Sequence, residues 1–228
     1  MIVKLTKKIQ ECKIGIIGFR STIIEKVLDK YNLDYIKISD ESLVDVDYFD
    51  STKFDFVLGS GVHSIIGCDI IDKVKFGIFM IHETPLPEGR GSAPLQWTVK
   101  NKKDNLTCTL FKINSGIDNG MIVYQHNIPV NIHDTLVNLE EKRSEGIFQC
   151  YDILISELLA GYITLRKQSG KGSYSKKRTP ADSNLDATQK LADLWDDIRI
   201  CDNEKFPAHF YVDGKKIILR YEVEHDNS

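Results

Sequence analysis

Short apolar runs alternate with segments of helical periodicity over the first 82 residues. The runs are CKIGIIGF (12–19), LDYIKIS (33–39), FDFVLGSG (54–61) and KFGIFMIH (75–82). Between them, STIIEKVLDKY (21–31) and HSIIGCDIIDKV (63–74) carry apolar residues at helical spacing. Continuous apolar strands that alternate with helices are typical of a parallel sheet covered on both faces. The pattern therefore predicts an α/β fold with a Rossmann-like, mostly parallel sheet.

The pattern changes after His82, where a loop rich in proline and glycine follows. Beyond it, 93–101 predicts a helix, 106–114 and 121–130 predict strands, and 134–162 predicts one long helix. Small and charged residues over 168–184 break the periodicity, which places a boundary near residue 166. We expect residues 1–165 to form the core. Residues 166–228 should form a small α+β module, with a helix over 187–200 and a hairpin turning at Asp213 and Gly214.

Two glycine-bearing segments match nucleotide-binding loops only in part. GIIGFRST (15–22) follows a strand but has only G-x-x-G, which disfavours binding of NAD or FAD. In SGKGS (169–173), Lys171 precedes glycine rather than Ser or Thr, so a flexible linker is the favoured interpretation. His63 follows a strand end on a glycine-bearing turn, where open α/β sheets bind ligands, although a structural role is the simpler interpretation.

Composition narrows the class of protein. Of 228 residues, 42% are hydrophobic and 28% are charged, which is the range of globular proteins. The formal net charge of -3 gives no general attraction for nucleic acid. The five cysteines are an odd count without a C-x-x-C, which disfavours a disulfide framework and a zinc site. No apolar run approaches the roughly 18 residues that a membrane span needs. We therefore expect a cytoplasmic protein, and the cysteine pattern leads us to expect no metal.

Two residues stand out as candidates for chemistry. His82 ends an apolar strand at the expected carboxyl edge of the sheet, directly before a loop stiffened by prolines. Asp118 lies between glycines in a turn that links two strands. A histidine and an aspartate on adjacent turns can act as a base and its orienter. Taken alone, an aspartate in such a turn is most often just a turn former.

The surrounding residues resemble a known family. HETPLPEGRGSAPLQW (82–97), followed by TLFKINSGIDNGMI (109–122), is similar to the signature of the folate-dependent formyltransferases. That family includes methionyl-tRNA formyltransferase, glycinamide ribonucleotide formyltransferase and the sugar N-formyltransferases. The resemblance is clearest over residues 54–130 and extends more weakly to Asp226. The loop and the tail most resemble the branch that acts on nucleotide-linked amino sugars in pseudaminic acid biosynthesis and related surface glycans.

The resemblance implies transfer of a formyl group from N10-formyltetrahydrofolate to an amine, without a metal. His82 would take the amine proton, and Asp118 would hold the ring and favour its charged form. The pterin would lie against one set of residues: Ser64, Ile65, Ile66, Leu86, Ile117 and Asn119. The sugar nucleotide would approach over a second set: Arg20, Thr84, Glu88, Arg90, Gly91 and Ser92. A homodimer through the carboxyl-terminal module also fits the resemblance.

One position departs from the family pattern. The commonest motif is Asn-x-His, in which the asparagine helps to hold the formyl oxygen, whereas this chain has Met80 there. His82 itself, a backbone N–H of the 83–91 loop or the Thr84 hydroxyl could replace it. Two alternatives stay open: formylation of another amine, such as that of methionyl-tRNA, and a relative that binds folate or a nucleotide without chemistry.

Overall fold

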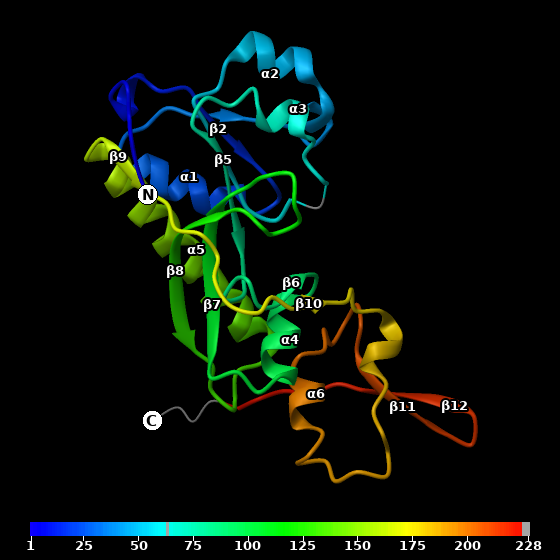
Figure 1. Ribbon diagram of the computed structural model, residues 1–228. Coiled ribbons are helices and arrows are strands. Elements are labelled where there is room, and N and C mark those ends of the chain that lie inside the picture. The colour runs from blue at the N-terminus through cyan, green and yellow to red at the C-terminus, as the bar shows by residue number, and fades with distance from the viewer. Residues whose placement is uncertain (63, 225–228) are drawn as a thin grey trace.

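A six-stranded mixed sheet organises the molecule, as seen in a computed structural model that describes residues 1–62 and 64–224 (Figure 1). The strand order is β3-β2-β4-β5-β7-β8. The strands β2 (Ile14–Ile17), β3 (Ile36–Lys37), β4 (Phe56–Gly59) and β5 (Gly77–His82) are parallel. The strands β7 (Asn105–Lys112) and β8 (Met121–Pro129) are antiparallel to their neighbours. The predicted α/β fold with a mostly parallel sheet is confirmed.

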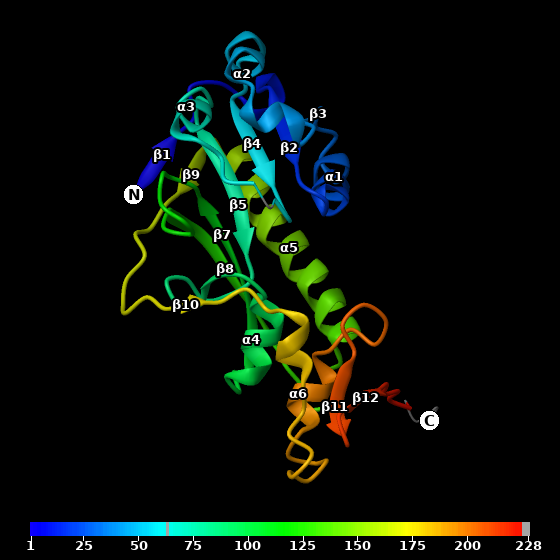
Figure 2. The ribbon, with the colours of Figure 1, turned by 90° about the vertical axis from the view of Figure 1, so that its right-hand side faces the viewer.

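Alternate side chains of the parallel strands enter two separate cores. On one face, Ile14, Phe56 and Phe79 pack against α1 (Ser21–Lys30) and α5 (Leu136–Leu159). On the other, Ile17, Val57 and Ile78 pack with residues of α2 (Val46–Thr52) and α3 (Cys68–Ile71). Figure 2 shows α5 running along the sheet with α1 beside it. Both strand faces are therefore apolar, which is why the sequence shows continuous runs instead of alternation.

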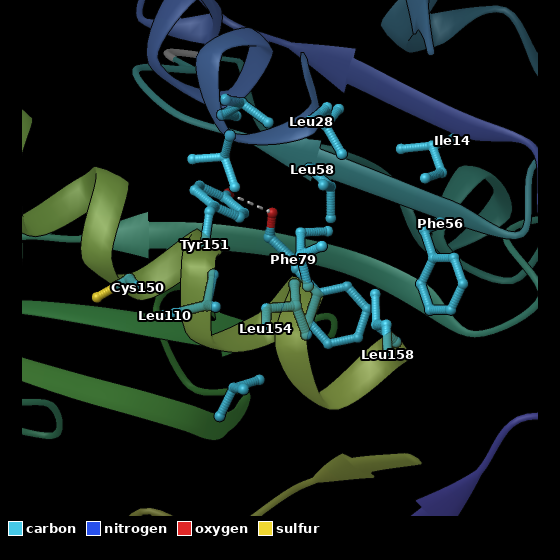
Figure 3. Packing of buried hydrophobic residues seen from close by; sticks show 14 of the residues in the cluster. Ile14, Leu28, Phe56, Leu58, Phe79, Leu110, Cys150, Tyr151, Leu154 and Leu158 are labelled. Atoms are coloured by element: carbon cyan, nitrogen blue, oxygen red, sulfur yellow. Dashed lines mark hydrogen bonds between the residues drawn. The ribbon is translucent and has the colours of Figure 1, made fainter. Parts of the chain in front are cut away.

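Tyr151 joins α5 to the middle of this sheet (Figure 3). Its ring is fully buried, and its hydroxyl donates to the carbonyl oxygens of Gly59 at 2.7 Å and Phe79 at 3.1 Å. The same hydroxyl accepts a hydrogen bond from the Gly59 amide at 3.0 Å. One phenol thus satisfies three backbone groups where β4 and β5 approach their carboxyl ends. Burial raises the pKa of Tyr151, so the hydroxyl stays protonated.

A strap formed by residues 166–178 returns across the sheet after α5. The strand β9 (Tyr162–Thr164) first pairs with β1 (Ile2–Lys4), and the strap then places β10 (Tyr174–Ser175) beside β6 (Arg90–Gly91). Figure 1 shows this yellow segment passing β6 toward α4 (Pro94–Lys100). The segment expected to be a flexible linker is therefore paired with the glycine-rich loop. None of these short pairings was expected from periodicity, because two- and three-residue strands leave almost no pattern.

The carboxyl-terminal segment carries a small cluster of its own and also contacts the core. Its elements are α6 (Trp195–Arg199) and the hairpin of β11 (Ala208–Val212) and β12 (Lys215–Leu219). Asp213 and Gly214 form the expected turn, both at positive φ. Ile200 packs with core residues, and the Trp195 indole donates to the Ile132 carbonyl at 2.7 Å. The boundary near residue 166 stays a prediction.

Three predicted elements are shorter in the structure than in the sequence pattern. The strand expected over 33–39 is reduced to β3, and the helix expected over 63–74 to α3. The helix expected over 187–200 is wrong in extent, since only α6 forms. There, the Asp186 carboxylate accepts from the Thr188 amide at 3.0 Å and from the Thr188 hydroxyl at 2.7 Å. Such local bonds compete with a helical start.

Candidate active site

A cleft of about 930 Å³ opens where the parallel strands end. Arg20 follows β2, Gly61 and Val62 follow β4, and His82 ends β5, and all four line this cleft. Ligands bind at this edge of open α/β sheets because the connecting loops leave a crevice there. His63, singled out in the sequence, lies outside the described residues.

His82 is held by the loop that follows it. Its imidazole is buried, and Nε2 lies 2.9 Å from the carbonyl oxygen of Gly89. Because a carbonyl can only accept, Nε2 must carry the proton of this hydrogen bond. The neutral ring therefore keeps its free lone pair on Nδ1, the nitrogen that can accept a proton.

Asp118 faces that free nitrogen from the turn between β7 and β8. Its Oδ2 lies 3.7 Å from Nδ1 of His82, which is too long for a hydrogen bond but close enough for a charge interaction. The backbone of Asp118 has a φ of 46°, a left-handed conformation that aspartate tolerates better than most residues. The ring orientation expected from Asp118 is thus supplied by Gly89. The Asp118 carboxylate faces the opposite ring nitrogen.

The glycine-rich loop connects these two side chains. The Gly89 carbonyl accepts from His82, and the Gly91 amide donates to Asp118 Oδ2 at 3.0 Å. Gly91 has a φ of 105°, and a Cβ there would lie 2.5 Å from the carbonyl oxygen of Ser175. Only glycine fits this close approach of the strap. The G-R-G sequence therefore has a structural reason that does not depend on direct contact with a ligand.

Part of the predicted binding set lines the cleft. For the pterin set, the lining residues are Ser64, Ile65, Ile66 and Ile117. For the sugar-nucleotide set, they are Arg20, Gly91 and Ser92. Ile65 is 81% exposed and Ile117 is 59% exposed, so two large aliphatic side chains project where Met80 and Phe111 also line the cleft. Exposed apolar surface of this kind suits a flat aromatic ligand.

The rest of the predicted set is not part of the cleft lining and has other contacts. Leu86 is buried against Phe111 and Ile122. The Glu88 carboxylate pairs with Lys103 at 2.9 Å. The Arg90 guanidinium donates to the Asn119 side chain at 2.8 Å, so Arg90 and Asn119 bind each other.

The loop offers few donors for a formyl oxygen. The Thr84 hydroxyl, one of the expected candidates, donates instead to the Glu88 carbonyl at 2.7 Å. Backbone N–H groups along the loop already have acceptors, namely those of Leu86, Glu88, Gly89, Arg90, Gly91 and Ser92. The Nε2–H group of His82, the third expected donor, is likewise engaged, by the Gly89 carbonyl.

Five charged residues line the cleft that the sequence analysis did not single out: Glu83, Glu140, Arg143, Lys177 and Arg178. Arg143 is only 7% exposed and its Nε lies 3.9 Å from the Glu83 carboxylate. Burial lowers the pKa of Arg143 to about 10, although Glu83 acts in the opposite direction, so the guanidinium is charged at neutral pH. The sequence pattern contained a signal for this burial. Arg143 stands four residues from both Leu139 and Ile147, which are buried, and so lies on the apolar face of α5.

In the parts of the chain that the structure describes, no helix is long and apolar enough to cross a membrane. Within the same residues, no three His, Cys, Asp or Glu side chains are grouped so as to hold a metal ion.

Comparison with known proteins points to one family. The chain is 28% identical over 175 residues to the bifunctional polymyxin resistance protein ArnA of Wigglesworthia glossinidia brevipalpis, covering 76% of this chain and 27% of that protein. It is 26% identical over 176 residues to the methionyl-tRNA formyltransferase of Thermodesulfovibrio yellowstonii, covering 77% and 56%. The matched part of the chain thus corresponds to about a quarter of the length of the first relative and to little more than half of the second.

Solved structures share the fold. A sugar N-formyltransferase from a Shewanella species superposes with a TM-score of 0.74 at 21% identity, covering 93% of this chain and 97% of that one. A 4-N formyltransferase from Francisella tularensis gives 0.77 at 16%, covering 94% and 98%. HypX from Aquifex aeolicus, in complex with tetrahydrofolic acid, gives 0.74 at 16%, covering 91% and 37%. The sequence model of the formyl transferase family matches residues 20–150, more than half of the chain, and the protein therefore belongs to the formyl transferase family.

Proposed function

We propose that this protein transfers the formyl group of N10-formyltetrahydrofolate to the amine of a nucleotide-linked amino sugar. Family membership supports folate-dependent formyl transfer. The observation that carries the choice of acceptor is the charge in the cleft. Four cations line it, Arg20, Arg143, Lys177 and Arg178, against the three carboxylates of Glu83, Asp118 and Glu140. An excess of guanidinium and ammonium groups suits the phosphates of a nucleotide.

The cleft lining divides by chemistry and by the elements that supply it. The turns after β4 and β7 contribute apolar side chains, including Ile65, Ile66 and Ile117. The start of α1, the helix α5 and the strap contribute the cations. The apolar part fits the pterin, whose role when bound is to present an activated formyl group. The cationic part would bind the phosphates of the acceptor.

His82 and Asp118 would act on the amine proton. The free lone pair on His82 Nδ1 would accept this proton as the amine nitrogen bonds to the formyl carbon. Asp118, 3.7 Å away, then stabilises the charged imidazolium. The same proton would pass to the folate nitrogen as its bond to the formyl carbon breaks, which releases tetrahydrofolate. The Gly89 carbonyl would keep the ring in one orientation throughout, because Nε2 carries a proton in both the neutral and the charged ring and can donate it to this carbonyl in each.

The decisive experiment is turnover with matched acceptors. Purified protein is mixed with N10-formyltetrahydrofolate and each of a panel of nucleotide-linked amino sugars, and release of tetrahydrofolate is followed. Each sugar is paired with its analogue that has a hydroxyl in place of the amine, and methionyl-tRNA forms a separate arm. We expect release with at least one amino sugar and none with its hydroxyl analogue. Turnover with methionyl-tRNA alone, or with no amine, would overturn the proposal.

The wider setting is also a proposal. Nucleotide-linked amino sugars are precursors of surface glycans, so the reaction would belong to surface polysaccharide biosynthesis in the cytoplasm. The homodimer expected from the resemblance stays a prediction, and a light-scattering mass equal to one chain would reject it.

A further inference from the structure

We propose that Gln168 and Arg90 are positioning residues that hold Asp118 in place for its action on His82. The inference rests on the proposed role of Asp118 in formyl transfer, and it adds the strap to the catalytic apparatus. Neither side chain lines the cleft. Their effect is carried by hydrogen bonds to the turn that presents Asp118.

Gln168 fixes the backbone on both sides of the turn. Its Nε2 donates to the carbonyl oxygen of Asp118 at 2.8 Å and to that of Gly120 at 2.9 Å. One of the two carbonyls belongs to Asp118 itself, whose backbone is left-handed with a φ of 46°. An amide is the group best suited to this task, because its NH₂ has two donors and no charge to leave uncompensated.

Arg90 completes the network from the other side. Its Nη2 donates to the Gln168 Oε1 at 2.6 Å and to the Asn119 Oδ1 at 2.8 Å. Its Nη1 donates to the Tyr174 hydroxyl at 3.3 Å. One guanidinium therefore joins the glycine-rich loop, the turn that presents Asp118 and the strap through its two terminal nitrogens.

This network explains how Asp118 keeps a position that its own bonds do not secure. Among the residues that the structure describes, the Asp118 carboxylate accepts one hydrogen bond, from the Gly91 amide, and its Oδ2 lies 3.7 Å from Nδ1 of His82. Arg90, the residue before Gly91, is tied through Gln168 to the Asp118 backbone. The segments that carry the Gly91 amide and the Asp118 carboxylate are thus linked to each other by the side chains of Arg90 and Gln168. Preorganisation of this kind is worth much in catalysis, because small displacements lower the rate steeply.

The test compares Gln168→Leu, which keeps the size but loses the bonds, with Gln189→Leu. Gln189 donates only within an exposed turn, to Asp186. We expect Gln168→Leu to lower kcat at least tenfold, with both KM values within about twofold and the melting temperature nearly unchanged. The control should match the parent protein. In the Asp118→Asn background, Gln168→Leu should have less than a twofold further effect on kcat, because it acts through Asp118. An additive loss in the double variant would overturn the inference.

A second measurement needs no turnover and so separates this inference from the proposed function. Hydrogen exchange of the Gly91 amide reports directly on its bond to Asp118. Exchange should be at least tenfold faster in Gln168→Leu than in Gln189→Leu, whether or not an acceptor has been found. Equal exchange rates in the two variants would show that Gln168 does not hold the turn. If exchange accelerates while no amine is formylated, the positioning role stands and the proposed acceptor fails.

Discussion

The imidazole of His82 donates from Nε2 to the carbonyl oxygen of Gly89 at 2.9 Å, which turns Nδ1 toward Asp118. The His82 ring is therefore oriented by a backbone group of the loop that follows it. The Asp118 carboxylate faces the opposite nitrogen, Nδ1, where it can interact with a positive charge on the ring. In the common arrangement, a carboxylate accepts a hydrogen bond from the ring nitrogen opposite the base, and here a backbone carbonyl has that place.

The first prediction concerns the tautomer of His82. With Nε2–H fixed by Gly89, the neutral ring should be the Nε2-protonated form, which nitrogen-15 chemical shifts of labelled histidine distinguish. The His82→Asn variant identifies which resonance belongs to this residue. A neutral His82 that carries its proton on Nδ1 would contradict both the hydrogen bond and the choice of base.

Removing the base should reduce turnover strongly. We expect His82→Asn to lower kcat by at least about a hundredfold, the usual scale for a lost general base. The strand should still form, because the backbone of His82 pairs with Thr109 independently of the ring. Circular dichroism checks the fold. Near-normal turnover in a folded variant would remove His82 from the chemistry.

Asp118→Asn separates charge from turn shape. Asparagine tolerates the left-handed backbone, and its oxygen can still accept from the Gly91 amide, so the melting temperature should barely change. The negative charge facing His82 is lost, so kcat/KM should fall well beyond tenfold. If the variant keeps more than about a tenth of the parent kcat/KM, a loss below roughly 1.4 kcal/mol, Asp118 is only a turn former.

Arg178→Gln tests the cationic part of the cleft. Arg178 lines the cleft, whereas the neighbouring Lys176 pairs with Asp182 and does not line it. We expect Arg178→Gln to raise KM for the sugar nucleotide at least tenfold with kcat within twofold, since a phosphate contact would contribute mainly to binding. Lys176→Gln is the matched control and should leave KM unchanged. The same KM in both variants would argue against phosphate binding by Arg178.

Tyr151→Phe tests the link between α5 and the sheet. The change removes the hydroxyl that contacts three buried backbone groups of Gly59 and Phe79. Unfolding in urea should show a loss of about 1–3 kcal/mol in the free energy of unfolding. Tyr211, which is 55% exposed, provides the control, because Tyr211→Phe should change that free energy by less than about 0.5 kcal/mol. Equal stabilities would mean that the phenol is not needed.

The alternation of apolar runs and helical segments determined the fold class, because each strand buries both faces and each helix one. The sequence also singled out His82 and Asp118 as candidates, since both stand at breaks in regular patterns, and the structure brings them within 3.7 Å of each other. Short elements such as β6 and β10 left no comparable signal. They exist because the strap and the loop are brought together by residues far apart along the chain.

Tertiary structure alone decided what the side chains around His82 do. The sequence predicted ligand-binding roles for Arg90 and Asn119, and in the structure the Arg90 guanidinium donates to the Asn119 side chain. Arg143 read as part of an ordinary helix, but it is buried at the cleft beside Glu83. Periodicity records which side of an element is apolar. It does not record which polar groups meet when distant segments fold together, and that meeting fixes the geometry of the site.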